Sequence, residues 1–457
     1  MRQKITMCPS FSVNIPTKVQ SVISDFYAKY NAISLILDEN PCILDAFHAD
    51  LCTYGSSSGR DAFYSSEQIL RMFIIKTIEE LDWRGLVIRV TESDFLRNFA
   101  CIGIGKVMTF SFLCNASKLI KPETWEKINA LLLNYAKENG SVTSESLRVD
   151  STVVESNIHY PTDTSLLWDC YRVGSRLLGR YRDKDLRCPR YRFHPKKVKK
   201  LYTFIATHIG KKTKSTERKV KSSRKELLEK VSELNCKIQQ VIEESKKLNM
   251  SIEQELMIRE LEELILKTCK VEDQSRRALN GEVVPAKERI FSIFEEHTEL
   301  LKRGKANKPI EFGHMVTIAQ TKEKFISYYH VDAVSPHDSA MTDVVINAHK
   351  DIFGTYPEKF TADKNYYKGM DEIRLWEQEI DCFSVGKKGK RSSDEEAREH
   401  DESFMNLQKF RAGCEGSISV LKRGFGMKRL LSRGFKSFKS WIGAIIFSHN
   451  LVKLAVP

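Results

Sequence analysis

The feature that most constrains the fold is a change of hydrophobic period near residue 145. In ESLRVDSTVV (145–154), Leu147 and Val149 alternate with polar neighbours, which is typical of a β-strand. Strand patterns return at 311–333, where EFGHMVTIAQ and FISYYHVDAV flank TKEK and predict a hairpin. The intervening residues 166–305 are charged and predicted to be helical. The chain therefore leaves a sheet, makes a helical excursion and returns, which indicates an α/β layer arrangement.

Residues 17–140 are predicted to form a compact helical module. Ser65 and Gln68 have the spacing of a capping box at the start of one helix, and Pro122 marks the first turn of another.

Within the helical excursion, an apolar residue recurs every three or four positions. The series is Leu227, Val231, Leu234, Ile238, Val241 and Leu248. This spacing predicts a helical hairpin or a short coiled coil, and a solvated helix on a larger body is an equally good interpretation. The helical pattern is predicted to continue through 287–305.

After the hairpin the pattern alternates between helix and strand. We predict a helix in SAMTDVVINAHKDIFG (339–354), a short strand ending at Asp363, a helix at 368–378, a strand in EIDCFSV (379–385) and a polar loop at 386–402. A helix containing Glu415 follows. The last segment (441–457) is predicted to be a core helix.

Positive charge is concentrated in one segment. Residues 176–225 contain 19 Lys or Arg against three acidic residues, whereas the whole chain has a net charge of +13. This stretch predicts a polyanionic partner, either nucleic acid or an acidic membrane surface. A solvated basic loop is the alternative interpretation.

Cysteine usage and hydropathy bear on the cellular compartment. The eleven cysteines include no Cys-x-x-Cys pair, the first residues have no apolar signal core, and no apolar run reaches the ~18 residues that a membrane span needs. We therefore expect a reduced, cytoplasmic protein with no membrane span.

Three carboxylates are candidates for a shared site. Asp150 and Asp363 are predicted at the carboxyl ends of strands, where ligand sites in α/β sheets lie. On a helix, Glu415 lies about 40° round from Arg411, and Lys422 about 20° round from Glu415. Clustered carboxylates suit Mg²⁺, and two such ions can support phosphoryl transfer. For each Asp alone, a cap or turn role is the simpler interpretation.

Four stretches together carry a family resemblance. They are LRVDSTVVESNIHYPTDTSLLWD (147–169), KPIEFGHMV (308–316), FTADKNYY (360–367) and FRAGCEGSISVLKRGFG (410–426). With SSEQILRMFIIKTIEELDWRGLVIRVTESDFLRNF in the N-terminal region, they resemble DDE transposases of bacterial insertion sequences, most closely the ISNCY type. The Arg-x3-Glu-x6-Lys part of the Tyr-Arg-Glu-Lys signature falls on Arg411, Glu415 and Lys422. Two positions depart from the family pattern, because Gln408 replaces the signature Tyr and Lys364-Asn365 follow the second acid.

The resemblance implies an RNase H-like catalytic domain (141–165 and 306–457), a helical N-terminal domain that binds DNA ends (1–140) and a long helical, basic insertion after the first strand (166–305). It implies that Asp150, Asp363 and Glu415 are the catalytic residues and the ligands of Mg²⁺ or Mn²⁺, with two ions expected. The expected DNA-binding residues are Arg411, Lys422, Arg423, Lys428, Arg429, Lys196, Lys197, Lys199 and Lys200.

The implied reaction is cutting and joining of DNA at the ends of an insertion sequence. The expected partners are double-stranded DNA, as terminal inverted repeats and target, and a second copy of the chain in a synaptic homodimer. The expected location is the cytoplasm, in association with the nucleoid. The alternatives are a transposase-derived DNA-binding protein without cleavage activity, an RNase H-like nuclease and a helical scaffold.

Overall fold

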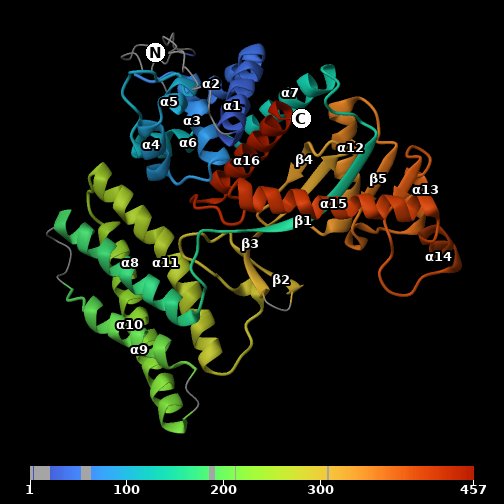
Figure 1. Ribbon diagram of the computed structural model, residues 1–457. Helices are drawn as coiled ribbons and strands as arrows, with labels where there is room; N and C mark the ends of the chain where they lie inside the picture. Colours follow the sequence, from blue (N-terminus) through green and yellow to red (C-terminus); the bar gives the residue numbers. More distant parts are fainter. Residues whose placement is uncertain are drawn as a thin grey trace. The chain divides into compact units, whose positions relative to one another are not determined.

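The computed structural model describes residues 4, 21–52, 63–184, 191–210, 213–305 and 308–456. The chain divides into two compact units, one formed by residues 1–156 and 313–457 and the other by residues 157–312. Figure 1 shows their elements along the chain.

Among the described residues, seven helices open the first unit. They are α1 (Ser21–Glu39), α2 (Pro41–Cys52), α3 (Ser66–Ile78), α4 (Trp83–Glu92), α5 (Asp94–Phe99), α6 (Phe110–Ser117) and α7 (Pro122–Glu138). The capping box predicted at α3 is confirmed, since the Ser65 hydroxyl accepts from the Gln68 backbone N–H and the Gln68 side chain accepts from the Ser65 N–H. Pro122 lies at the start of α7, also as predicted.

The C-terminal helix α16 (Phe435–Ala455) completes the core of these helices. It packs against α1, α3 and α7, and its residues from Ser440 to Leu451 are all buried. The core helix predicted at the end of the chain is therefore confirmed.

Within the described residues, six strands form a mixed sheet. The strands are β1 (Ser146–Glu155), β2 (Glu299–Lys305), β3 (Lys308–Thr321), β4 (Ile326–His330), β5 (Lys359–Ala362) and β6 (Cys382–Ser384). Their order is β2-β3-β1-β5-β6, with β4 paired to β3. β1, β5 and β6 are parallel, whereas β3 is antiparallel to β1 and to β4, which confirms the predicted hairpin.

The two faces of the sheet are covered by different helices. Leu147 and Val149 of β1 share an apolar cluster with residues of α12 (Met341–Phe353) and α13 (Met370–Trp376). Successive side chains of a strand point to opposite faces. Arg148 and Asp150 therefore face the other side, where α15 (Glu402–Gly424) contacts β1, β5 and β6 (Figure 1).

One predicted loop contains a helix. Residues 393–399 form α14 (Ser393–Glu399), which starts with a capping box between Ser392 and Glu395. The prediction of loop throughout 386–402 was wrong because the polar composition of this stretch masked the capping signal.

The second unit is a helical body. Its helices are α8 (Asp163–Lys184), α9 (Pro195–His208), α10 (Lys214–Ser245) and α11 (Ile252–Leu279), and they share one apolar core. The predicted apolar series lies on the buried face of α10 from Leu227 to Val241, whereas Leu248 lies beyond the helix end and is exposed. The hairpin interpretation is confirmed by the packing of α10 on α11. Residues 185–190 and 211–212 of the basic stretch lie outside the described residues.

The prediction of helix through residue 305 was wrong. α11 ends at Leu279, and Gly281 takes a left-handed backbone conformation with φ of +87°. Pro285 then starts a short 3-10 turn at Ala286–Glu288, and β2 occupies Glu299–Lys305. Gly and Pro stop the helix here, although the charged and apolar composition continues past them.

Among the described helices, none combines the length and the apolar character needed to cross a lipid bilayer.

Two buried histidines predict a pH dependence of stability. Burial lowers the pKa of His349 and of His449 to about 4, while the imidazole Nε2 of His349 donates to the Ser144 carbonyl. Unfolding restores a pKa near 6.5, so the unfolded chain binds more protons below that pH, and stability falls as pH drops toward 4. Each residue should cost about 2 kcal/mol of unfolding free energy at about pH 5.

Denaturant unfolding at several pH values tests this. The variant His349→Gln/His449→Gln should lose less stability than the wild type between about pH 7 and pH 5. Equal losses in the two proteins would show that neither histidine controls acid stability.

Candidate active site

The parallel pairing of β1 with β5 brings two of the predicted acids together. Val149 pairs with Ala362, the last residue of β5, and Asp150 and Asp363 are the residues that come next in the chain. The prediction that Asp150 ends its strand was wrong, because β1 continues to Glu155 through its antiparallel ladder with β3. The ladder with β5 does end here, so both aspartates lie where the parallel pairing stops.

Asp363 follows β5 and leads into the 3-10 turn Lys364–Tyr366. It takes the N-cap position of this turn, but its side chain makes no capping hydrogen bond. Its carboxylate has no hydrogen bond or ion pair with any described residue, and the side chain is half-buried. The cap role therefore does not account for this carboxylate.

Helix α15 supplies the third acid and the cation that precedes it. The helix predicted around Glu415 is present, and Arg411 lies one turn before Glu415. Arg411 Nη1 lies 3.8 Å from Asp150 Oδ2, while Arg411 Nε is buried and has no hydrogen-bond partner. Glu415 is exposed and makes no ion pair with any described side chain.

The electrostatics of Asp150 reflect all of these groups. Burial raises the pKa of Asp150, the charges of Asp363 and Glu415 raise it further, and the Ser151 backbone N–H and Arg411 lower it. The Ser151 N–H donates to Asp150 Oδ1 at 2.7 Å. Arg411, 3.8 Å away, does not offset the increase in the pKa of Asp150 that burial and the two like charges cause. The site therefore has a surplus of negative charge.

The donor chemistry of this site fits a hard divalent cation. The three carboxylates offer oxygen ligands with few competing partners, and their mutual repulsion favours a bound positive charge. Across the described ranges, no three His, Cys, Asp or Glu side chains are gathered closely enough to enclose an ion by themselves. Mg²⁺ keeps several waters and commonly uses one or two carboxylates with substrate phosphates, so an open set of ligands is compatible with it.

A buried arginine that sequence reasoning missed joins β1 to α15. Arg148, two residues before Asp150, is only 3% exposed. Its Nε donates to Gln320 Oε1 at 2.9 Å on β3, and its Nη1 donates to the Phe410 carbonyl at 3.0 Å on α15. The guanidinium also lies 4.7 Å from the centre of the Phe410 ring. Strand alternation puts Arg148 on the face of Asp150, and that signal could have identified it.

The arginine explains one glycine of α15. A Cβ on Gly413 would lie 2.3 Å from Arg148 Nη1, whereas a Cβ on Gly416 would meet nothing within 4 Å. Gly413 therefore makes room for the guanidinium, which is held on both sides by hydrogen bonds. No described neighbour requires glycine at 416.

Gln408 ties the same helix to the ends of β5 and β6. Its amide Nε2 donates to the Ser384 carbonyl at 2.7 Å and lies 3.1 Å from the Ser384 hydroxyl. The Thr361 hydroxyl lies 3.3 Å away. The residue at the signature Tyr position thus anchors α15 to the strand ends.

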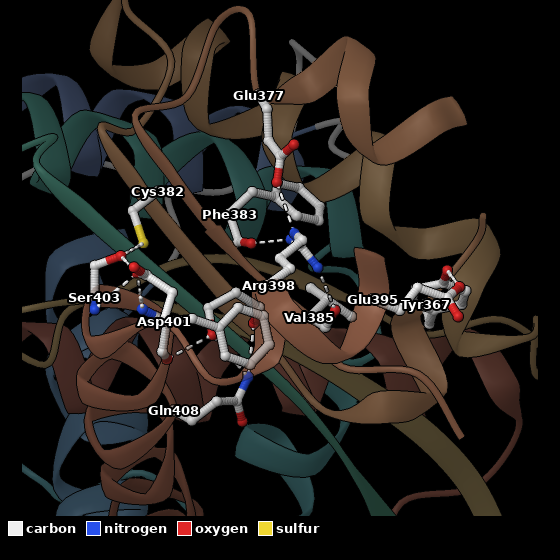
Figure 2. A network of polar contacts seen from close by, with 12 residues as sticks. Tyr367, Glu377, Cys382, Phe383, Val385, Glu395, Arg398, Asp401, Ser403 and Gln408 are labelled. Carbon is white, nitrogen blue, oxygen red and sulfur yellow. Dashed lines mark hydrogen bonds and ion pairs between the residues drawn. The ribbon is translucent and has the colours of Figure 1, made fainter. Parts of the chain in front are cut away.

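The segment after β6 is held by a second arginine. Arg398 of α14 donates to the Phe383 and Val385 carbonyls and pairs with Glu377 at 2.7 Å (Figure 2). Glu395 accepts from Tyr367 and pairs with Lys387 at 2.8 Å. These contacts fix the chain between β6 and α15.

The predicted DNA-binding cations fall into two groups. Lys422 and Arg423 end α15, and Lys428 and Arg429 follow in a segment that joins the end of β1, where the Glu155 N–H donates to the Lys428 carbonyl. Arg423, Lys428 and Arg429 are exposed. The other group, Lys196, Lys197, Lys199 and Lys200, is exposed on α9 of the second unit, and Lys197 lies 3.8 Å from Glu226.

Comparison with protein families gives a match to part of the chain. Residues 293–451 match the family model of the transposase DDE domain, which supports a DDE transposase. The matched range is about a third of the chain and includes Asp363, Arg411, Glu415 and Lys422, whereas Asp150 lies upstream of it. Neither the curated proteins nor the solved structures include a match.

The two glycines of α15 provide a matched test of the arginine contact. Gly416→Ala should raise the free energy of unfolding by up to about 1 kcal/mol, because Ala favours a helix over Gly. Gly413→Ala gains the same propensity but collides with Arg148, and overpacking typically costs about 1–3 kcal/mol, so this variant should be the less stable of the two. Denaturant unfolding measures both. Equal stabilisation by the two substitutions would contradict the arrangement.

Proposed function

We propose that this protein is a transposase that cuts and joins DNA at the ends of an insertion sequence by metal-dependent phosphoryl transfer. The observation that carries the proposal is the shared electrostatics of Asp150 on β1, Asp363 just after β5 and Glu415 on α15. The match to the transposase DDE domain, which includes two of these acids, supports it.

In this proposal Asp150, Asp363 and Glu415 hold Mg²⁺ or Mn²⁺, with two ions expected. The bound ions would activate the attacking oxygen and stabilise the leaving oxygen. The protein residues then have separate roles. Asp150 and Asp363 provide carboxylate oxygens at the end of the β1–β5 ladder, and Glu415 provides one from α15. Arg148 positions α15 and does not contact substrate.

Arg411 is proposed to bind a DNA phosphate beside the ions. Its buried Nε lacks a partner, and its distance of 3.8 Å from Asp150 leaves the guanidinium available for a closer ligand. Lys422, Arg423, Lys428 and Arg429 would extend this contact along the DNA backbone, where binding is electrostatic and salt-dependent. Gln408 would not assist chemistry as a Tyr could, since its amide already bonds to Ser384.

Several finer features belong to the same proposal. The catalytic domain would be RNase H-like and comprise residues 141–165 and 306–457, and the helices of residues 1–140 would bind DNA ends. The insert 166–305, with the lysines of α9, would add a DNA surface. We also propose the ISNCY type, a homodimer in the synaptic complex and association with the nucleoid.

Stability measurements test the surplus charge without any assay of activity. The raised pKa of Asp150 means that its ionised form destabilises the folded state at neutral pH. Asp150→Asn should therefore raise the free energy of unfolding in EDTA by on the order of 1 kcal/mol. Asp371→Asn, at an exposed position of α13, should change it by less than about 0.5 kcal/mol.

Adding Mg²⁺ should reverse the order of the two proteins. A cation that binds only the folded state raises the melting temperature of the wild type, and Asp150→Asn should lose most of this gain. A wild type that is insensitive to both Mg²⁺ and Mn²⁺ would contradict a metal site at these acids.

Cleavage of DNA that carries the inverted repeats next to the coding region tests the reaction itself. Asp150→Asn, Asp363→Asn and Glu415→Gln should each lower the cleavage rate by at least about 10²-fold while DNA binding persists. Glu402→Gln, at the exposed start of the same helix, is the matched control and should cut normally.

The products distinguish the alternatives. Binding without cutting by the wild type would identify a DNA-binding protein, and cutting without joining would identify a nuclease. Normal cutting by Glu415→Gln would remove Glu415 from the site.

A further inference from the structure

The helical unit contains a cation-lined groove, and its cations on α10 belong to the basic stretch 176–225. It has a volume of about 750 Å³ and lies between α10 and the C-terminal end of α11. Arg218, Lys221 and Lys225 line it from α10, and Arg276 lines it from α11. Glu229 is the acidic residue among its lining side chains.

Three of these cations are not neutralised within the described structure. Arg218, Lys221 and Lys225 are exposed and form no ion pair with any described residue, whereas Arg276 pairs with Glu272 at 2.6 Å. Their spacing of three and four residues puts them on one face of α10 over about 10 Å. A strand of B-DNA carries one phosphate per ~3.4 Å of axis, so this row matches about three phosphates.

A smaller pocket of about 190 Å³ adjoins the groove. Leu279 lines both, and Arg224 is the residue next to Lys225 of the groove. Three buried polar atoms of this pocket lack a hydrogen-bond partner, namely Arg224 Nε, Arg289 Nε and Ser275 Oγ. Buried polar atoms without a partner are uncommon, and here two belong to cationic side chains.

The acid of this pocket is already engaged. Asp163 Oδ1 accepts from Arg289 at 2.7 Å and from Gln274 at 3.1 Å. Arg224 has no carboxylate partner among the described residues. The unmet donors therefore favour an oxyanion as the ligand.

We propose that the groove binds the phosphodiester backbone of duplex DNA and that the adjoining pocket receives one phosphate. The inference deepens the proposed function and rests on it, because DNA is the polyanion that a transposase must hold. It places contacts on α10 and α11, apart from the α9 lysines predicted from sequence. The contacts would be to phosphates, so they would be independent of DNA sequence.

Binding of the full-length protein to a short DNA duplex of arbitrary sequence tests the groove. Fluorescence anisotropy in EDTA over a range of salt concentrations gives the dissociation constant and its salt dependence without cleavage. The groove variant is Arg218→Gln/Lys221→Gln/Lys225→Gln. The control variant removes three exposed cations of the same unit that do not line the groove, Lys247→Gln/Arg259→Gln/Lys287→Gln.

The groove variant should bind DNA at least about tenfold more weakly at about 0.15 M salt, and its log–log salt slope should fall by about three. The control variant should stay close to the wild type. Thermal melting of all three proteins verifies folding, since the altered side chains are exposed.

Two results would overturn the inference. The groove variant could bind DNA with the affinity and salt slope of the wild type. Alternatively, the control variant could lose as much DNA affinity as the groove variant, which would show that only the net charge of the protein matters. A groove variant that binds DNA normally but loses binding to polyglutamate-coated beads would point to an acidic protein partner instead and would also overturn it.

The outcome separates this inference from the proposed function. If the wild type cuts terminal repeats and the groove variant binds normally, the groove assignment fails alone. If the groove variant loses DNA binding and the wild type never cuts, the transposase reaction fails alone.

Discussion

The buried guanidinium of Arg148 is the interaction on which the geometry of the site depends. It lies two residues before Asp150 on β1 and bonds at once to Gln320 on β3 and to the Phe410 carbonyl on α15. Burying a cation is costly unless its donors are satisfied, so these partners must be kept close. The register of α15 on the sheet follows from this contact, and with it the positions of Arg411 and Glu415.

The same constraint explains why the site can tolerate its excess of negative charge. Asp150 is held on a strand paired on both edges, and α15 is anchored by Gln408 as well as by Arg148. A rigid frame can hold carboxylates whose repulsion would otherwise separate them, and the unfavourable charge then becomes affinity for a cation. In the proposed function, the charge that lowers stability at Asp150 would favour the binding of a cation.

Much of this arrangement follows from local sequence signals, and the rest depends on contacts far apart in the chain. The capping box at Ser65, the alternation around Val149 and the helix around Glu415 are short-range patterns, and the structure has all three elements. Strand alternation places Arg148 on the same face as Asp150, but no local pattern indicates its contact with Phe410, which lies 262 residues away. β2 was predicted as helix because the apolar and polar residues of ELLKRGK do not alternate. The stretch also follows residues whose composition is typical of a helix. The proximity of Asp150 to Asp363 was predicted from their places at strand ends and from the family resemblance, and the pairing of β1 with β5 brings them together.

In the proposed function, Asp150 on β1, Asp363 just after β5 and Glu415 on α15 share bound divalent metal. Anomalous scattering from crystals of the protein grown or soaked with Mn²⁺ tests it most directly, because it locates the ion without reference to activity. The account predicts anomalous density between Asp150, Asp363 and Glu415, with carboxylate oxygens at roughly 2.0–2.2 Å from the ion. Manganese bound elsewhere, with the Asp363 or Glu415 side chain turned away from Asp150, would contradict it.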